Sequence, residues 1–285
     1  MIKILKYLFE ACFVYLFYII GKLLGLNLSR KIFSYVFVYL APFFKSKKIV
    51  YKNLEIFNKN LSHNQKKLII ESMWKNYGMT FIEYIFLNYF RKNNEHVEII
   101  GENILMDIII NKKKVIFISG HFANFELMSM EITKKGIDLA AIYRPLNNYF
   151  LNPFMEHVRR KYVCQNQIKK GVQGVKKAVE YLNKNFSIAL MIDQRVSEGE
   201  KIEFFGRKAF TTTLPAQLAL KYNLQIIPVF IERKNDNSFK IEFSKGIKAS
   251  DFENKFKLTK RLNETLENMI TKKPSHWIWS HDRWK

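Results

Sequence analysis

A short apolar strand that runs into a polar turn is the feature that most constrains this fold. Residues Val115 to Ser119 are apolar or small and end at Gly120, which predicts a buried β-strand. The segment Phe125 to Lys135 has apolar residues at helical spacing and stops before Gly136, a typical helix C-cap. A buried strand that leads directly into a helix favours a layered α/β fold.

A histidine and a glutamate flank the turn between these two elements. His121 follows the strand, and Glu126 lies five residues further on. Because residues three or four apart share a helix face, this gap predicts that His121 precedes the helix and Glu126 lies in its first turns. A histidine oriented by a carboxylate is a ready general base. The structural alternative is a packing role for His121 and a helix N-terminal role for Glu126.

The rest of the chain alternates in the same way, which predicts an α/β layered fold with a mostly parallel central sheet. Further strands are predicted at Val97 to Ile100, Leu139 to Tyr143, Ser187 to Ile192, Gln225 to Glu232 and Phe239 to Phe243. Further helices are predicted at Asn103 to Ile110, Asn152 to Lys161, Val172 to Asn183, Thr213 to Tyr222 and Leu258 to Ile270. Asn53 to Asn60 is expected to be a connector, and Ser62 with Gln65 to form a capping box before a long helix.

Two apolar segments occupy the N-terminal part of the chain. Ile4 to Leu28 is interrupted by three charged residues, and Ile32 to Phe44 is followed by lysines. Residues 1–48 are therefore predicted to form a membrane anchor, with one spanning or interfacial helix and one shallower apolar helix. Residues 49–285 are predicted to form the catalytic domain. A hairpin of helices buried in a soluble core is the alternative.

Net charge, cysteine spacing and the absence of known binding motifs limit which partners and cofactors are expected. The formal net charge is +22, which implies an acidic partner such as nucleic acid, an anionic membrane surface or an acidic substrate. The two cysteines, Cys12 and Cys164, lack metal-ligand spacing, so a zinc site is not expected. No P-loop, dinucleotide-binding glycine motif or G-x-S-x-G elbow occurs. Nucleic-acid binding has only the charge in its favour.

Polar residues follow several of the predicted strands. Besides His121, Arg144 follows the strand that ends at Tyr143, and Asp193 and Arg195 follow the strand that ends at Ile192. Ligands of α/β sheets bind beyond the carboxyl ends of the strands. These side chains are therefore predicted to share one site. Singly, each arginine could be a surface residue, and Asp193 a loop or capping residue.

At this point the sequence resembles a known family. GHFANFE matches the H-x4-D/E motif of the glycerolipid acyltransferases, and in particular the late (secondary, lauroyl/myristoyl-type) acyltransferases of lipid A biosynthesis. The ordered likeness covers about residues 50–285 and comprises Tyr143-Arg144-Pro145, Arg159 in HVRRKY with Arg160 as its rival, Asp193 in MIDQR, Phe204 to Gly206, Thr211 to Thr213, and the tail WIWSHDRWK. Asp282 and Leu214 depart from the residues common in this family.

The resemblance implies acyl transfer from an acyl-carrier-protein thioester to a hydroxyl of a lipid A precursor. It makes His121 the general base and Glu126 the carboxylate that fixes its tautomer. It further implies that four residues bind substrate or the developing oxyanion, namely Arg144, Arg159, Asp193 and Arg195.

No cofactor is expected beyond the thioester-bound acyl donor, and no metal. The expected partners are acyl carrier protein, a phosphorylated glycolipid acceptor and the anionic lipids of the bacterial inner membrane, with no nucleic acid. The catalytic domain is expected on the cytoplasmic face of that membrane. Alternatives are another glycolipid or phospholipid acceptor, a thioesterase or hydrolase, and a non-catalytic basic membrane or nucleic-acid binder.

Overall fold

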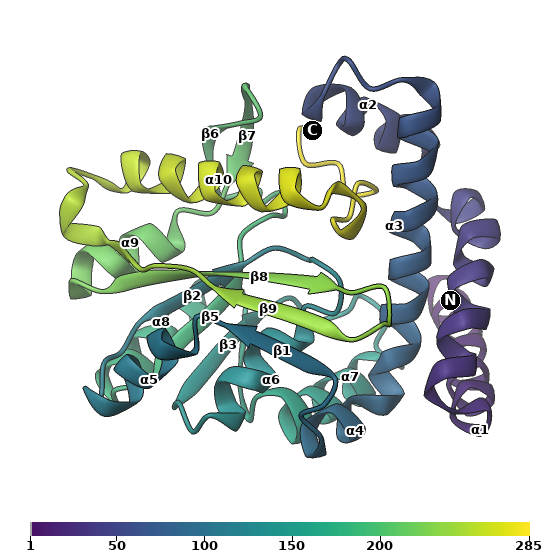
Figure 1. Cartoon of the computed structure of the whole chain (residues 1–285), viewed down its shortest axis with the longest axis horizontal. Helices are drawn as coiled ribbons and strands as arrows, with labels where there is room; N and C mark the ends of the chain where they lie inside the picture. The colour runs from purple at the N-terminus through teal and green to yellow at the C-terminus, as the bar shows by residue number, and fades with distance from the viewer. Residues whose placement is uncertain (1) are drawn as a thin grey trace.

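A mostly parallel eight-stranded sheet forms the centre of the molecule (Figure 1). The computed structural model describes residues 2–285. The strand order is β1-β9-β8-β2-β5-β3-β4, with β10 paired to β8. Only the pairs of β8 with β9 and with β10 are antiparallel, which confirms the predicted fold class. The strands are β1 (Val97–Ile100), β2 (Ile116–Ser119), β3 (Leu139–Tyr143), β4 (Asn166–Lys169), β5 (Ser187–Met191), β8 (Gln225–Arg233), β9 (Phe239–Phe243) and β10 (Ile247–Lys248).

Helices precede, connect and follow the strands, and several of them pack against the sheet. They are α4 (Leu87–Lys92), α5 (Glu102–Ile110), α6 (Glu126–Lys134), α7 (Asn152–Val158), α8 (Val172–Asn183), α9 (Leu214–Tyr222) and α10 (Lys255–Lys272). The α8 helix contacts β3, β4 and β5, and α9 contacts β2 and β8. The predicted helices and strands recur here with boundaries that differ by a few residues.

Four strands and two helices differ from the sequence predictions, and one of these helices is α4, which was not predicted. The segment expected to be a connector is instead largely helical, because α2 runs from Lys47 to Phe57 and begins at a Ser46 cap. Strands β4 and β10 were not predicted. Neither was the hairpin of β6 (Glu200–Phe204) and β7 (Arg207–Thr211). Its two-residue turn has positive φ at both positions, 50° at Phe205 and 67° at Gly206, which matches the twist of a hairpin.

The long helix α3 (His63–Glu83) begins at the predicted capping box. The Ser62 hydroxyl accepts from the Gln65 N–H, and the Gln65 side chain accepts from the Ser62 N–H, so two helix N-terminal donors are satisfied. Near its other end, Gly78 lets α1 approach closely. A Cβ atom at Gly78 would lie 2.1 Å from the carbonyl oxygen of Phe33.

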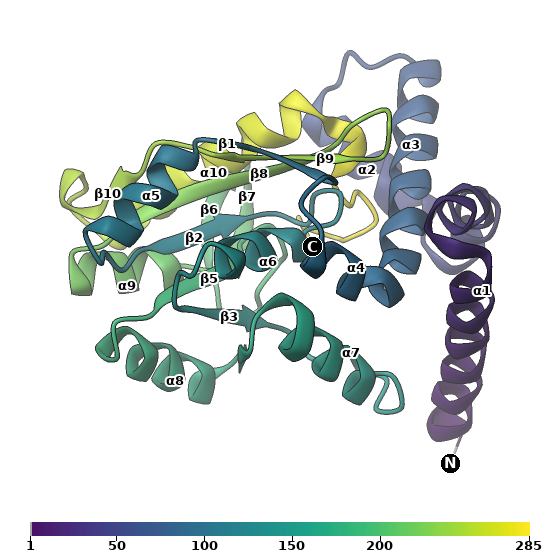
Figure 2. The same cartoon turned by 60° about the horizontal axis from the view of Figure 1, so that its bottom comes forward.

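The first helix, α1 (Ile2–Phe44), bends at Gly25, which has φ 74° and ψ 170°. We call residues 2–24 the first arm and residues 26–44 the second arm; Figure 2 shows the bend between them. Both arms pack on α3, since Tyr18, Phe33 and Phe37 stack around Phe81. By length and composition α1 is able to cross a membrane. Only 17% of its most apolar window is buried, so a hairpin buried in a soluble core is not what the structure shows.

The parallel strands bring their carboxyl ends to one edge of the sheet. Strands β2, β5, β3 and β8 all run the same way, so the residues that follow them meet at that edge. The register of β2 on β5 pairs Ser119 with Met191. Two residues beyond each of these positions stand His121 and Asp193.

Candidate active site

His121 lies at the centre of a tight turn that leaves the buried strand β2. The Phe122 N–H donates to the Gly120 carbonyl oxygen at 2.8 Å, which closes the turn around His121. Two hydrogen bonds then join this residue to Asp193. The His121 N–H donates to Asp193 Oδ2 at 2.9 Å, and Nδ1 lies 2.7 Å from Asp193 Oδ1. Backbone and ring of His121 are thus both held by one carboxylate.

Asp193 is buried and charged. Burial alone would raise the pKa of its carboxyl, but the adjacent His121 and its hydrogen bonds, together with the Trp277 indole, outweigh burial and bring the pKa to about 2. The Trp277 Nε1–H donates to Asp193 Oδ2 at 2.9 Å. A carboxylate that accepts from Nδ1–H fixes the imidazole tautomer in which Nε2 has a free lone pair.

The Nε2 atom of His121 is the ring nitrogen that Asp193 leaves free, in a side chain that is partly exposed. The side chain is 19% exposed, whereas that of Asp193 is 3% exposed. The Gln194 amide nitrogen lies 3.5 Å from Nε2, and the Phe125 ring packs edge-on against the imidazole. A base with its inner nitrogen buried on a carboxylate and its outer nitrogen accessible is suited to take a proton from an incoming hydroxyl or water.

The pairing of His121 with Glu126 predicted from the sequence is wrong in this structure. The Glu126 carboxylate instead accepts from Arg159, with Nε at 2.9 Å and Nη2 at 2.6 Å from the same oxygen, and from the Tyr84 hydroxyl. The physical reason is competition: Asp193 already occupies Nδ1, and Arg159 offers Glu126 a full charge. A catalytic role for Glu126 stays a prediction.

Arg159 and Arg160 differ in burial. The Arg159 side chain is 12% exposed and lies over the rings of Tyr84 and Tyr143. Burial would lower the pKa of its guanidinium, but Glu126 and Tyr84 outweigh burial and raise it. Arg160 is exposed and lines a hollow with the residues that precede β3 and β4. Arg159 is therefore the arginine that pairs with Glu126 of the motif, and its functional role stays a prediction.

The other two predicted arginines, Arg144 and Arg195, are more weakly held by their surroundings than Arg159. Arg144 follows β3 at the expected edge and is exposed. Arg195 is half-buried; its N–H donates to His281 Nε2 at 3.0 Å, and its guanidinium lies over the Phe210 ring. The structure therefore brings His121 and Asp193 into direct contact and leaves the substrate-binding roles of Arg144 and Arg195 as predictions.

Sequence reasoning missed several residues that hold the site. Trp277 and His281 come from the C-terminal tail, whose tryptophan, histidine and arginine pattern was noted but not given a role. Tyr84 follows α3 and carried no local signal. Its hydroxyl bonds both Glu126 and Arg159, and burial together with the Glu126 carboxylate raises its pKa well above the usual value despite the opposing effect of Arg159.

A buried histidine beside the site makes stability pH-dependent. Burial, with Arg233 and Lys273 adding to it, lowers the pKa of His276 to about 3. In the unfolded chain a histidine binds a proton near pH 6.5. This contribution to stability is therefore full above about pH 6.5 and is lost as the pH falls towards 3, at about 1.4 kcal/mol per pH unit. We expect His276→Gln to flatten the fall in unfolding free energy between pH 7 and 5.

Urea unfolding at several pH values measures this slope. His63→Gln, which changes an exposed histidine at the start of α3, is the control and should keep the wild-type slope. Equal slopes for wild type and His276→Gln would contradict the assignment.

The fold and this geometry define an α/β protein with a paired histidine and buried aspartate at the carboxyl edge of its sheet. The sequence matches the model of the bacterial lipid A biosynthesis acyltransferase family over residues 2–285. The lipid A biosynthesis acyltransferase of Haemophilus influenzae is 22% identical over 265 residues, which cover 89% of this chain and 82% of that protein. The lipid A biosynthesis acyltransferase 2 of Shigella flexneri is 22% identical over 186 residues, covering 63% and 58%.

The chain belongs to the bacterial lipid A biosynthesis acyltransferase family. It is an acyltransferase, and the resemblance seen in the sequence is confirmed. Among solved structures, the 1-acyl-sn-glycerophosphate acyltransferase of Thermotoga maritima overlaps with a TM-score of 0.42 at 13% identity, covering 89% of this chain and 96% of that one.

Proposed function

We propose that this acyltransferase moves a fatty acyl chain from an acyl-carrier-protein thioester to a hydroxyl of a lipid A precursor, with His121 as general base. The observation that carries the proposal is the 2.7 Å contact of His121 Nδ1 with the buried carboxylate of Asp193. It leaves Nε2 as the proton acceptor at the open edge of the sheet. A hydroxyl is a weak nucleophile at neutral pH, so a positioned base is what the reaction needs.

The proposed reaction has two steps. The acceptor oxygen attacks the thioester carbonyl carbon while His121 Nε2 takes the hydroxyl proton, and Asp193 stabilises the imidazolium that forms. The tetrahedral intermediate then collapses, the carbon–sulfur bond breaks, and the leaving thiol sulfur receives the proton from Nε2. Because Glu126 already neutralises Arg159, we assign acceptor phosphates to the exposed Arg144 instead.

The N-terminal helix supports a position at a membrane. Large apolar side chains are exposed along both arms of α1, including Leu23 and Phe43 at 83% each. The first arm also contacts the segment that follows β3. The Asn148 amide donates to the Tyr7 carbonyl oxygen, and the Tyr15 hydroxyl donates to that of Phe150. Contacts along the arm favour a helix that lies in the interface, and we propose the cytoplasmic face of the inner membrane as its place.

Charge supports the proposed partners. Acyl carrier protein is acidic, the acceptor is phosphorylated and the membrane surface is anionic, so a chain of net charge +22 attracts all three. The boundary near residue 48 stays a prediction, because the second arm of α1 packs on α3 of the catalytic domain.

The direct test is a reconstituted reaction. Purified full-length protein, an acyl-carrier-protein thioester and a lipid A precursor are combined in detergent, and the lipids are analysed by mass spectrometry. We expect a lipid product heavier by one acyl chain. Free fatty acid without acylated lipid would favour a thioesterase, and acylation of another glycolipid or a phospholipid alone would change the acceptor. Lipid A from cells that lack the protein should be missing one acyl chain.

A further inference from the structure

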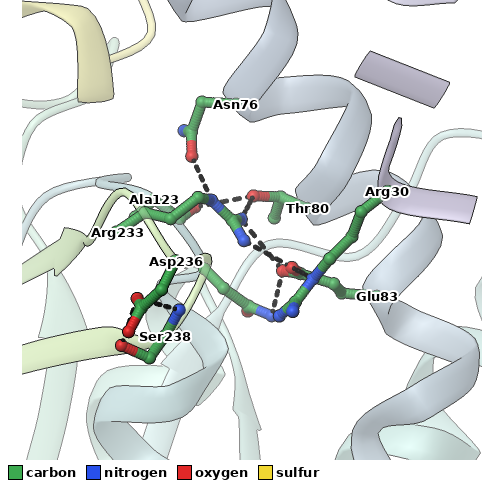
Figure 3. A network of polar contacts seen from close by, with 9 residues as sticks. Arg30, Asn76, Thr80, Glu83, Ala123, Arg233, Asp236 and Ser238 are labelled. Atoms are coloured by element: carbon green, nitrogen blue, oxygen red, sulfur yellow. Dashed lines mark hydrogen bonds and ion pairs between the residues drawn. The ribbon is translucent and has the colours of Figure 1, made fainter. Parts of the chain in front are cut away.

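A buried network of polar side chains contacts the turn between His121 and Glu126, which we call the catalytic turn (Figure 3). At its centre is Glu83, the last residue of α3, which is 0% exposed. Arg233, at the end of β8, and Arg30, in the second arm of α1, both donate to its carboxylate. Although burial alone would raise the pKa of Glu83, the two arginines hold it below its usual value. The Glu83 carboxylate is therefore charged and forms ion pairs with both arginines.

This network makes two hydrogen bonds to the catalytic turn. The Asn124 amide donates to Glu83 Oε2 at 2.9 Å, and the Thr80 hydroxyl donates to the Ala123 carbonyl oxygen at 3.0 Å. Thr80 in turn accepts from Arg233 Nη2 at 3.2 Å. The contacts of Thr80 and Glu83 with the turn therefore involve Ala123 and Asn124, the two residues midway between the histidine and the glutamate of the H-x4-E motif.

The backbone of this turn is strained at Ala123. Ala123 has φ 43°, in the left-handed region that a residue with a Cβ atom rarely adopts. Such a conformation persists only where its surroundings over-determine it. Here the Ala123 N–H donates to the His276 carbonyl oxygen at 3.2 Å, and Thr80 holds the carbonyl group on the other side. The turn is thus fixed from outside rather than by its own sequence.

We propose that Glu83 is a positioning residue for acyl transfer: with Arg233 and Thr80 it holds the strained turn at Ala123 and Asn124, and so aims His121 at the substrate. A buried ion cluster is weak support for stability, because desolvation offsets its attraction, but it specifies which elements meet. This one joins α3, β8, the catalytic turn and, through Arg30, the second arm of α1. The seating of α1 on the domain is therefore part of the catalytic geometry.

The inference rests on the proposed function only for its kinetic test. Thr80→Val keeps the side-chain shape and removes the hydroxyl that holds Ala123, and Asn124→Ala removes the link to Glu83. We expect each to lower kcat on the order of 10- to 100-fold with KM little changed, because small misplacements of a catalytic group have large effects. Thr80→Ser keeps the hydroxyl and should restore most of the activity. Wild-type kcat in both Thr80→Val and Asn124→Ala would overturn the proposal.

A separate variant tests the link between Glu83 and Arg30 of α1. Arg30→Met leaves Glu83 paired with Arg233 and should lower kcat about tenfold while vesicle binding stays unchanged. Ser34→Ala is the control from the same arm, since within residues 2–285 its buried hydroxyl bonds only the Lys31 carbonyl oxygen of its own helix. Wild-type kcat in Arg30→Met would remove α1 from the proposal.

A matched control and a second readout separate this proposal from the proposed function. Thr259→Val makes the same change at a buried threonine of α10 whose hydroxyl has no hydrogen-bond partner within residues 2–285, and it should keep wild-type kcat. The rate at which diethyl pyrocarbonate modifies His121, followed by peptide mass spectrometry, reports the turn without any substrate. Thr80→Val and Asn124→Ala should change this rate, and Thr259→Val should not. Inactive wild type would refute the proposed function, and an unchanged modification rate would refute the positioning role.

Discussion

Asp193→Asn is expected to lower kcat on the order of 10⁴-fold, close to the loss in His121→Ala. The asparagine amide presents an N–H group to Nδ1, which favours the tautomer with its proton on Nε2. The base then has no free lone pair at the open edge of the site. Single-turnover acyl transfer by the purified variants measures the effect, and circular dichroism checks that each is folded.

Controls for this prediction come from the same chain. Asp107→Asn changes an aspartate paired with Lys113 on the surface, and it should keep wild-type kcat. In the proposed mechanism His121 and Asp193 act as a unit, so the double variant should lose little more than either single one. If Asp193→Asn retained near-normal kcat, a different carboxylate would have to orient His121.

Arg159→Met is expected to destabilise the protein by about 3–5 kcal/mol, because it leaves the buried Glu126 charge without its cation. The Tyr84 hydroxyl alone does not replace a guanidinium that donates twice to one carboxylate oxygen. Urea unfolding of the detergent-solubilised protein measures the loss. The double change Arg159→Met with Glu126→Gln removes both charges and should recover most of the stability.

The neighbouring arginine provides the comparison for this second prediction. Arg160→Met alters an exposed side chain and should change the unfolding free energy by no more than about 0.5 kcal/mol. Equal stability of Arg159→Met and wild type would show that the pair with Glu126 is dispensable for the fold.

Together these predictions separate two functions within one motif. In the H-x4-E segment, the histidine belongs to a pair with Asp193, and the glutamate belongs to a pair with Arg159 that ties α6 to the residues following α7. Loss of the first pair should appear in kcat with the fold intact. Loss of the second should appear first in stability.

Much of the fold could be predicted from local patterns. Strand β3, strand β9 and helix α8 have the predicted boundaries, because apolar periodicity and flanking glycines or polar residues act over a few neighbouring positions. The β6–β7 hairpin was missed because its strands are polar and half-exposed, and its turn lacks the usual asparagine–glycine pair. Helix α2 was missed because its buried face is short and includes the polar Asn53.

The sequence by itself determined that a strand ends at Gly120, that a helix follows, and that His121 lies between them at the end of the strand. These are properties of neighbouring residues. Only the tertiary structure decided which carboxylate orients that histidine. Asp193 lies 72 residues further along the chain, and it reaches His121 because Ser119 of β2 pairs with Met191 of β5. Glu126 lies much closer in sequence but binds Arg159, because the fold brings the residues that follow α7 against the start of α6 and Asp193 already occupies Nδ1.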